Sequence, residues 1–136
     1  MAVPRRRIRE SGTYFVTSRT WQGRRLFINA AVCEIFRTSL LGYRDQGHYL
    51  LHAFVWMPEH FHLLITPAED VALERAVPFI KGGSAHRIRE ERQLTFPVSQ
   101  RGFSDHRIRD YGDYETHVRY IEQNSVKRRI VTAASE

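Results

Sequence analysis

Cysteine is nearly absent from this sequence, which contains only Cys33. A single cysteine excludes a disulfide framework and a cysteine-rich zinc site, and it is typical of a reducing cytoplasm. Long apolar runs are absent as well: no segment approaches the length of a membrane span, and no apolar region follows the basic N-terminus as it would in an export signal. We therefore expect a soluble cytoplasmic protein with no membrane partner.

Lysine is also scarce. Lys81 and Lys127 are the only lysines among 21 basic residues, which stand against 15 acidic residues and give a net charge of +6. Arginine makes bidentate contacts with phosphate, so its excess favours a polyanionic partner and a nucleoid-associated protein. Nucleotide-composition bias in the genome is an alternative explanation of the arginine excess, although it does not explain the net positive charge.

Internal repeats and low-complexity linkers are not found either. A chain of 136 residues is long enough to bury one hydrophobic core, so a single domain is predicted. We place this domain at residues 11–131, between a basic N-terminal arm at 1–10 and a short C-terminal tail at 132–136. The arm contains Arg5, Arg6 and Arg7, which either contact a phosphate backbone or belong to a solvated tail.

Two β-rich segments, residues 13–20 and 49–56, predict the first two strands. The link Met57-Pro58-Glu59 is too short to join parallel strands, so the apolar run after it predicts an antiparallel hairpin. Between the two strands, Asn29 is the expected N-cap of a helix that ends at Gly47.

Helices dominate the second half of the chain. Asp70 is expected to cap a helix in which Pro78 either introduces a kink or begins a new helix, and Gly82-Gly83 interrupts the pattern again. A basic helical stretch at 85–92, a loop with a short strand at 96–103 and a helix around Tyr120 follow. This order predicts an α+β fold in which helices cover one face of an antiparallel sheet.

His60 and His62 alternate with apolar residues in the strand after the hairpin turn. Because side chains of a strand alternate between its faces, both imidazoles should leave one face while Phe61, Leu63 and Ile65 enter a core on the other. Two neutral imidazoles side by side on a rigid strand can bind a divalent cation. Alternatively, the two histidines are hydrogen-bonded surface residues.

The segment around Tyr120 has helical periodicity, which places Asp113, His117, Tyr120 and Asn124 on one polar stripe. Tyr120 and Asn124 are one turn apart, so they can present a phenolic nucleophile and an amide metal ligand together if the stripe faces the two histidines. Alternatively, Tyr120 is a boundary residue with a packed ring and a solvated hydroxyl. His117 either assists proton transfer or is solvated on the helix surface.

Several sequence blocks occur in an order that resembles the REP-associated tyrosine transposases, relatives of the single-tyrosine HUH transposases of bacterial insertion sequences (IS200-like transposases). The resemblance covers residues 12–131. Two positions depart from it: Ser125 stands where the family usually has proline, and Ser99 stands where tryptophan is common. The blocks that carry it are Leu51–Leu64, Leu73–Ala76, Ile80–Gly83, Gly102–Asp110 and Tyr120–Asn124.

This resemblance implies a ferredoxin-like (RRM-like) fold, with the histidine motif on a sheet strand and the nucleophile on the C-terminal helix. His60, His62 and Asn124 would then be the metal ligands, and Tyr120 would be the catalytic residue. The donor atoms admit Mg²⁺, Mn²⁺ or Zn²⁺, and similarity to the family favours Mg²⁺ or Mn²⁺.

Residues of the middle helices are expected to hold DNA, with Lys81 and Arg87 as the best candidates. Alternatively, Lys81 is an ordinary surface lysine with no role in DNA binding. The resemblance further implies that the partner is single-stranded DNA with hairpins, and that the protein acts as a monomer or homodimer.

The activity implied by the resemblance is metal-dependent cleavage and strand transfer of single-stranded DNA next to REP-type hairpins, through a 5′-phosphotyrosine intermediate. One alternative is a catalytically silent hairpin-binding protein derived from a transposase. Another is a metal-dependent phosphodiesterase that uses activated water. Only the first activity produces a covalent adduct between protein and DNA.

Overall fold

The computed structural model describes residues 12–128, and the side chains up to residue 124. The predicted arm at 1–10, which contains Arg5, Arg6 and Arg7, and the predicted tail at 132–136 lie outside this part of the chain. The elements follow in the order β1 (Tyr14–Arg19), two short 3-10 turns η1 (Trp21–Gly23) and η2 (Leu26–Ile28), α2 (Ala30–Asp45), β2 (Tyr49–Met57), β3 (His60–Pro67), α3 (Leu73–Arg92), β4 (Ser104–Arg107) and α4 (Tyr111–Arg128).

The four strands form one sheet in the order β2-β3-β1-β4, and each neighbouring pair is antiparallel. The predicted hairpin between β2 and β3 is confirmed. Before α4, the element order is β-α-β-β-α-β, which is the order of ferredoxin-like motifs. The α+β class and the antiparallel sheet predicted from the sequence are therefore confirmed.

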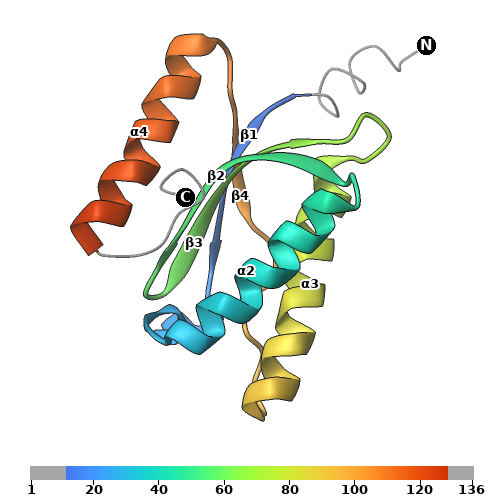
Figure 1. Ribbon diagram of the computed structural model, residues 1–136, viewed down its shortest axis with the longest axis vertical. Coiled ribbons are helices and arrows are strands. Elements are labelled where there is room, and N and C mark those ends of the chain that lie inside the picture. The colour runs from blue at the N-terminus through green and yellow to red at the C-terminus, as the bar shows by residue number, and fades with distance from the viewer. Residues whose placement is uncertain (1–11, 129–136) are drawn as a thin grey trace.

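Helices lie on both faces of the sheet, with α2 and α3 on one side and α4 on the other (Figure 1). The expectation that helices cover only one face is wrong. Strands β2 and β3 bury apolar side chains on both faces: Phe54 and Trp56 contact the α2 and α3 side, whereas Ala53 and Val55 contact α4. A sheet that is apolar on both faces requires a cover on each.

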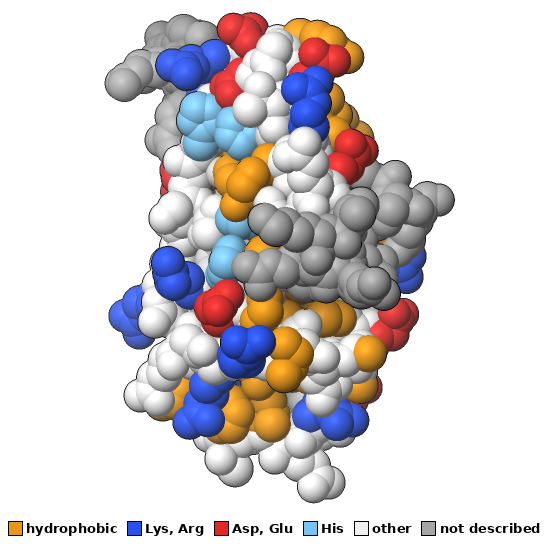
Figure 2. Space-filling model, turned by 90° about the vertical axis from the view of Figure 1, so that its left-hand side faces the viewer, with side chains coloured by type: hydrophobic (Ala, Val, Ile, Leu, Met, Phe, Trp, Pro, Cys, Tyr) orange, Lys and Arg blue, Asp and Glu red, His pale blue; other side chains and the backbone are white. Residues whose placement is uncertain are grey.

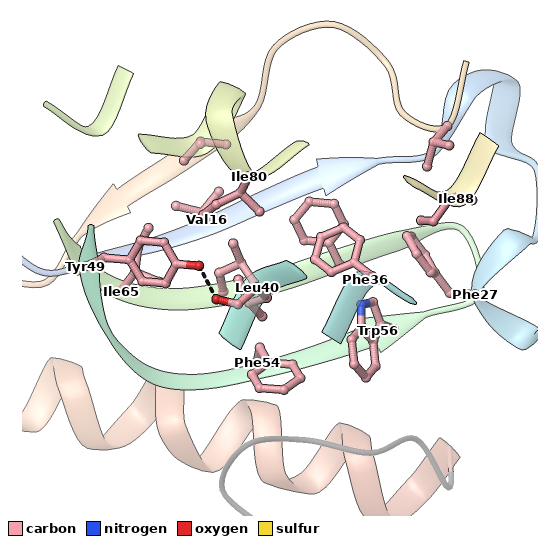
Figure 3. Close-up of a cluster of buried hydrophobic side chains, with 14 of the residues drawn as sticks. Val16, Phe27, Phe36, Leu40, Tyr49, Phe54, Trp56, Ile65, Ile80 and Ile88 are labelled. Atoms are coloured by element: carbon pink, nitrogen blue, oxygen red, sulfur yellow. Dashed lines mark hydrogen bonds between the residues drawn. The ribbon is translucent and has the colours of Figure 1, made fainter. Parts of the chain in front are cut away.

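The larger core lies between the sheet and the pair α2 and α3 (Figure 3). Its centre contains edge-to-face and tilted ring pairs. The ring centroid of Phe36 is 4.8 Å from that of Phe61 and 6.1 Å from that of Trp56. The Tyr49 hydroxyl, also buried here, donates a hydrogen bond to the carbonyl of Leu40. The polar atom of this ring is therefore satisfied within the core.

The predicted N-cap of α2 is confirmed, because the Asn29 side chain accepts hydrogen bonds from the backbone N–H groups of Ala31 and Val32. The Asp70 cap is wrong: α3 has Ala72 at its N-cap position and no side-chain cap. Proximity to the start of an apolar periodic segment therefore did not identify the capping residue here.

The helix α3 runs through both of its expected interruptions, Pro78 and Gly82-Gly83. Its buried residues before and after Pro78, including Val77 and Ile80, face one core, so tertiary packing outweighs the single backbone hydrogen bond that proline removes. Gly83 lies where a Cβ atom would be 1.7 Å from the Tyr43 hydroxyl. This glycine permits close packing of α2 against α3 and does not end the helix.

The short strand predicted within residues 96–103 is misplaced, since β4 is Ser104–Arg107. Its four residues are polar and carry no apolar alternation, because β4 is an exposed edge strand that pairs only with β1. Pairing partners, which the local sequence does not reveal, define this element. Within residues 12–128, no helix combines the length and apolar character needed to cross a membrane.

Candidate active site

The side chains of His60 and His62 leave the same face of β3, as the alternation predicts. Their ring centroids are 4.8 Å apart, and the intervening Phe61 lies in the larger core on the opposite face. Strand register also brings β1 to this pair, because Thr17 is opposite His62 and Arg19 is opposite His60. The pair therefore has a fixed spacing on a strand in the interior of the sheet.

A polar group orients each ring through its Nδ1 atom. The Thr17 hydroxyl lies 2.9 Å from Nδ1 of His62, and a Glu59 carboxylate oxygen lies 3.2 Å from Nδ1 of His60. Hydrogen bonding at Nδ1 makes Nε2 the nitrogen that can coordinate a cation, and a carboxylate in this position increases ligand basicity. Thr17 and Glu59 were missed by the sequence analysis, although Glu59 directly precedes the first histidine.

His62 is a buried histidine with one nitrogen that is not satisfied by a hydrogen bond among the described residues. It is 5% exposed, and among residues 12–128 nothing forms a hydrogen bond with its buried Nε2 atom. Burial, followed by the nearby His60 and His117 rings, lowers the pKa of His62 to about 4, so the imidazole is neutral at neutral pH. A buried, neutral and unpartnered nitrogen fits a bound divalent cation, which would satisfy it.

Tyr120 reaches this site from α4, where it is 43% exposed. Its ring centroid is 5.5 Å from that of His62 and 6.0 Å from that of Phe15, in both cases with an edge-on orientation. Phe15 also stacks on His62 at 4.9 Å. The phenol thus lies beside the histidine pair in the same chain, supported by an aromatic residue of β1 that the sequence analysis missed.

Asn124 follows one turn later on α4, and its side-chain N–H donates a 2.8 Å hydrogen bond to the backbone carbonyl of Tyr120. The nitrogen end of the amide is therefore engaged within the helix, and the oxygen is the end that can act as a ligand. Its assignment as the third metal ligand stays a prediction.

The two other tyrosines near the start of α4 occupy different surroundings. Tyr111 is 71% exposed. Tyr114 packs against the small core under α4, and its hydroxyl lies 3.1 Å from Nδ1 of His52. The Tyr114 side chain is partly buried. Of the three, Tyr120 is the tyrosine with a ring contact to His62.

The two predicted DNA contacts on α3 are not close to the histidine pair, because α3 lies on the opposite face of the sheet (Figure 1). Lys81 donates hydrogen bonds to the carbonyls of Gln100 and Gly102, which holds the segment before β4, and burial lowers its pKa. Arg87 contacts the Ser39 hydroxyl at 3.3 Å. Their role in binding DNA stays a prediction.

Arg19 is a cationic residue that the sequence analysis did not select. It is exposed at the end of β1, on the sheet face of Thr17 and opposite His60. On the side of the molecule shown in Figure 2, histidines lie among hydrophobic side chains, and Lys and Arg side chains lie above and below them with Asp and Glu side chains in between. Strand pairing would have identified Arg19, but this pairing joins segments far apart in the sequence.

The comparisons with known proteins agree with this geometry. The family described as "Transposase IS200 like" matches residues 13–124. A REP-associated tyrosine transposase bound to a REP hairpin has a similar structure, with a TM-score of 0.69 and 27% identity over 87% of this chain and 68% of that chain. A transposase-like protein from Deinococcus radiodurans R1 shares the fold, with a TM-score of 0.58 and 18% identity over 82% of this chain and 88% of that chain.

Curated proteins give no significant match. The family match spans most of the chain and includes the histidine pair, Tyr120 and Asn124. On this match, the chain belongs to the family of IS200-like transposases.

Proposed function

We propose that this protein is a metal-dependent endonuclease and strand transferase that acts on single-stranded DNA next to hairpins. The observation that carries the proposal is the contact between Tyr120 and His62, whose ring centroids are 5.5 Å apart within one chain. A candidate nucleophile and a candidate metal ligand thus meet without a second copy of the protein. This arrangement supports a monomer that carries a complete catalytic site.

His60, His62 and Asn124 would hold a divalent cation, and family similarity favours Mg²⁺ or Mn²⁺. When bound, the cation would orient the scissile phosphate and neutralise the charge that develops during transfer. The unpartnered Nε2 of His62 supports this assignment. Thr17 and Glu59 would keep the two imidazoles oriented through their Nδ1 atoms.

In the proposed reaction, the phenolic oxygen of Tyr120 attacks phosphorus in line with the leaving 3′-oxygen. The bond between phosphorus and tyrosine forms while the bond to the 3′-oxygen breaks, and the phenolic proton is lost to water or to a base. The leaving oxygen takes up a proton and becomes a free 3′-hydroxyl. The product is a 5′-phosphotyrosine that a 3′-hydroxyl can later attack to rejoin a strand.

Arg19 would contact the phosphate next to the cleaved bond. Its guanidinium is permanently charged, and it extends from the same sheet face as the histidine pair. The relative bound to a REP hairpin supports hairpin DNA as the substrate class. The net charge of +6 supports it too, because each neutralised phosphate contributes to affinity through counterion release.

The test uses the full-length protein and single-stranded DNA from the palindromes that flank its own gene, labelled at the 3′ end, with Mg²⁺ or Mn²⁺. Denaturing gels should show a labelled adduct of protein and DNA. Tyr120→Phe should remove this adduct while hairpin binding persists. Tyr111→Phe is the matched control, because it changes an exposed tyrosine on the same helix and should leave the adduct unchanged.

Three results would contradict the proposal or its assignment of the nucleophile. Binding without cleavage by the unmodified protein, under every metal condition, would support a catalytically silent hairpin-binding protein. Cleavage by Tyr120→Phe at the rate of the unmodified protein and without an adduct would support hydrolysis by activated water instead. Mass spectrometry that located the nucleotide on Tyr111 or Tyr114 would refute the assignment of Tyr120.

A further inference from the structure

A second group of side chains with metal-ligand donor atoms lies next to the candidate active site and has no role in the proposed cleavage. His106 comes from β4, whereas Asp113 and His117 come from α4, and one donor atom of each residue lies within 4.8 Å of the other two. The Nε2 atom of His106 is 2.9 Å from one carboxylate oxygen of Asp113, and Nδ1 of His117 is 3.3 Å from the other. Two imidazoles therefore converge on one carboxylate.

The backbone fixes this convergence. Asp113 and His117 are four residues apart on α4 and so share one face of the helix. His106 is held from the other side, because its residue pairs with Phe15 in the sheet. The His106 and His117 rings stack with centroids 4.9 Å apart, and the backbone N–H of Arg109 donates to the Asp113 carboxylate at 3.0 Å. Asp113 is only 14% exposed, so its carboxylate has little freedom to turn away.

We propose that His106, Asp113 and His117 form a binding site for a divalent transition metal, with Zn²⁺ as the best-suited ion. Two imidazoles and a carboxylate are a typical zinc donor set, and water can occupy the fourth position. Donor atoms about 2.0–2.2 Å from a tetrahedral zinc lie about 3.3 Å apart. The 2.9 Å separation between Nε2 of His106 and the Asp113 carboxylate is close to this spacing. Nδ1 of His117 is 3.3 Å from that carboxylate and donates a 2.8 Å hydrogen bond to the Asp113 backbone carbonyl, a bond that the ion would replace.

This site is separate from the histidine pair on β3. Phe15 lies between the two groups, with its ring centroid 4.9 Å from His62 and 4.6 Å from His117. The second ion would connect the edge strand β4 to the first turns of α4, one turn before Tyr120. Its role would be to hold α4, and therefore the proposed nucleophile, in a fixed orientation over the sheet.

The test requires neither DNA nor cleavage, so its outcome is independent of the proposed function. The full-length double variant His60→Ala/His62→Ala, freed of metal with a chelator, is titrated with Co²⁺ as a spectroscopic substitute for Zn²⁺. We expect this variant to retain one equivalent of bound ion with the visible absorption of tetrahedral cobalt. Zn²⁺ should displace the cobalt and raise the melting temperature of the variant.

Adding His106→Ala to the double variant should weaken binding at least about tenfold and abolish the Zn²⁺-dependent rise in melting temperature. Asp113→Asn, which keeps the side-chain shape, should likewise weaken Co²⁺ binding, measured through the visible absorption of the bound cobalt. The matched control is His86→Ala, which removes an exposed histidine of α3 and should change neither measurement. Failure of the double variant to bind Co²⁺, or unchanged binding after His106→Ala, would overturn the proposal.

Discussion

The two faces of the sheet are built for different tasks. The face toward α2 and α3 is covered by one continuous core of large apolar side chains, whereas the face toward α4 has a smaller apolar cluster of Ala53, Val55, Met57, Leu64 and Ile121. Beside that smaller cluster lie the histidines and Tyr120. Because β3 supplies alternate residues to both faces, stability and chemistry come from neighbouring positions of the same strand.

The most direct way to test this comparison is to truncate two adjacent residues of β3. Phe61→Ala removes a ring that packs against Phe27 and Phe36 and should lower the free energy of unfolding by about 3–5 kcal/mol. His62→Ala should reduce cleavage at least about 100-fold and lower the free energy of unfolding less than Phe61→Ala does, because Nε2 of His62 has no hydrogen-bond partner among residues 12–128 and only the Nδ1 contact with Thr17 is lost.

Urea unfolding and the adduct assay would measure both variants. The proposed difference between the two faces would be refuted if His62→Ala lowered the free energy of unfolding as much as Phe61→Ala. It would also be refuted if cleavage persisted after His62→Ala in a folded protein.

A second prediction concerns the packing of α2 against α3. Gly83→Ala should destabilise the protein by about 1–3 kcal/mol, because the new Cβ atom forces the Tyr43 ring out of its contact with Phe79. Gly82→Ala is the matched control: nothing lies within 4 Å of its Cβ position, so better helix propensity should stabilise the protein by up to about 1 kcal/mol. Equal effects in urea unfolding would refute the assigned role of Gly83.

The third prediction returns to the α4 face. Thr17→Val removes the hydrogen bond to Nδ1 of His62 with little change in volume, so the metal concentration for half-maximal cleavage should rise by about tenfold. Thr13→Val, which loses a hydrogen bond to Thr66 on the same face, should leave that concentration unchanged. A metal titration of the cleavage rate distinguishes the two, and an identical response would count against orientation by Thr17.

The smallest effects are expected at helix starts on the core side. Asn29→Ala should cost about 1 kcal/mol, since two backbone N–H groups lose their acceptor. Asp70→Ala should remain within about 0.5 kcal/mol of the unmodified protein, because α3 has no side-chain cap. Thermal unfolding of the two variants measures this difference. A larger loss for Asp70→Ala would show that the residue stabilises α3 in another way.

Local patterns predicted the parts of the fold that depend on neighbouring residues. The β2 and β3 hairpin, the Asn29 cap and the shared face of His60 and His62 follow from turn length, capping and alternation. The continuity of α3 through Pro78 and the position of β4 did not follow, because each depends on a distant partner. The second helical cover was missed for the same reason.

The residues of the candidate site also differ in whether local sequence or long-range pairing reveals them. Resemblance and periodicity selected Tyr120, and the structure brings it to the histidine pair. Phe15, Thr17 and Arg19 were not selected, although they alternate along β1, because only strand pairing shows that they face the histidines. His106 was missed because β4 has no apolar pattern that identifies it as a strand.

The register between β1 and β3 determines which chain-length changes this family member can tolerate. A single inserted residue within either strand would reverse the faces beyond it, exchanging histidines for core residues such as Phe61. Insertions in the segment 93–103, which connects α3 to β4, leave that register intact. Natural variants should therefore differ in the length of this connection, while the spacing from Phe15 to Arg19 and from His60 to Leu64 stays constant.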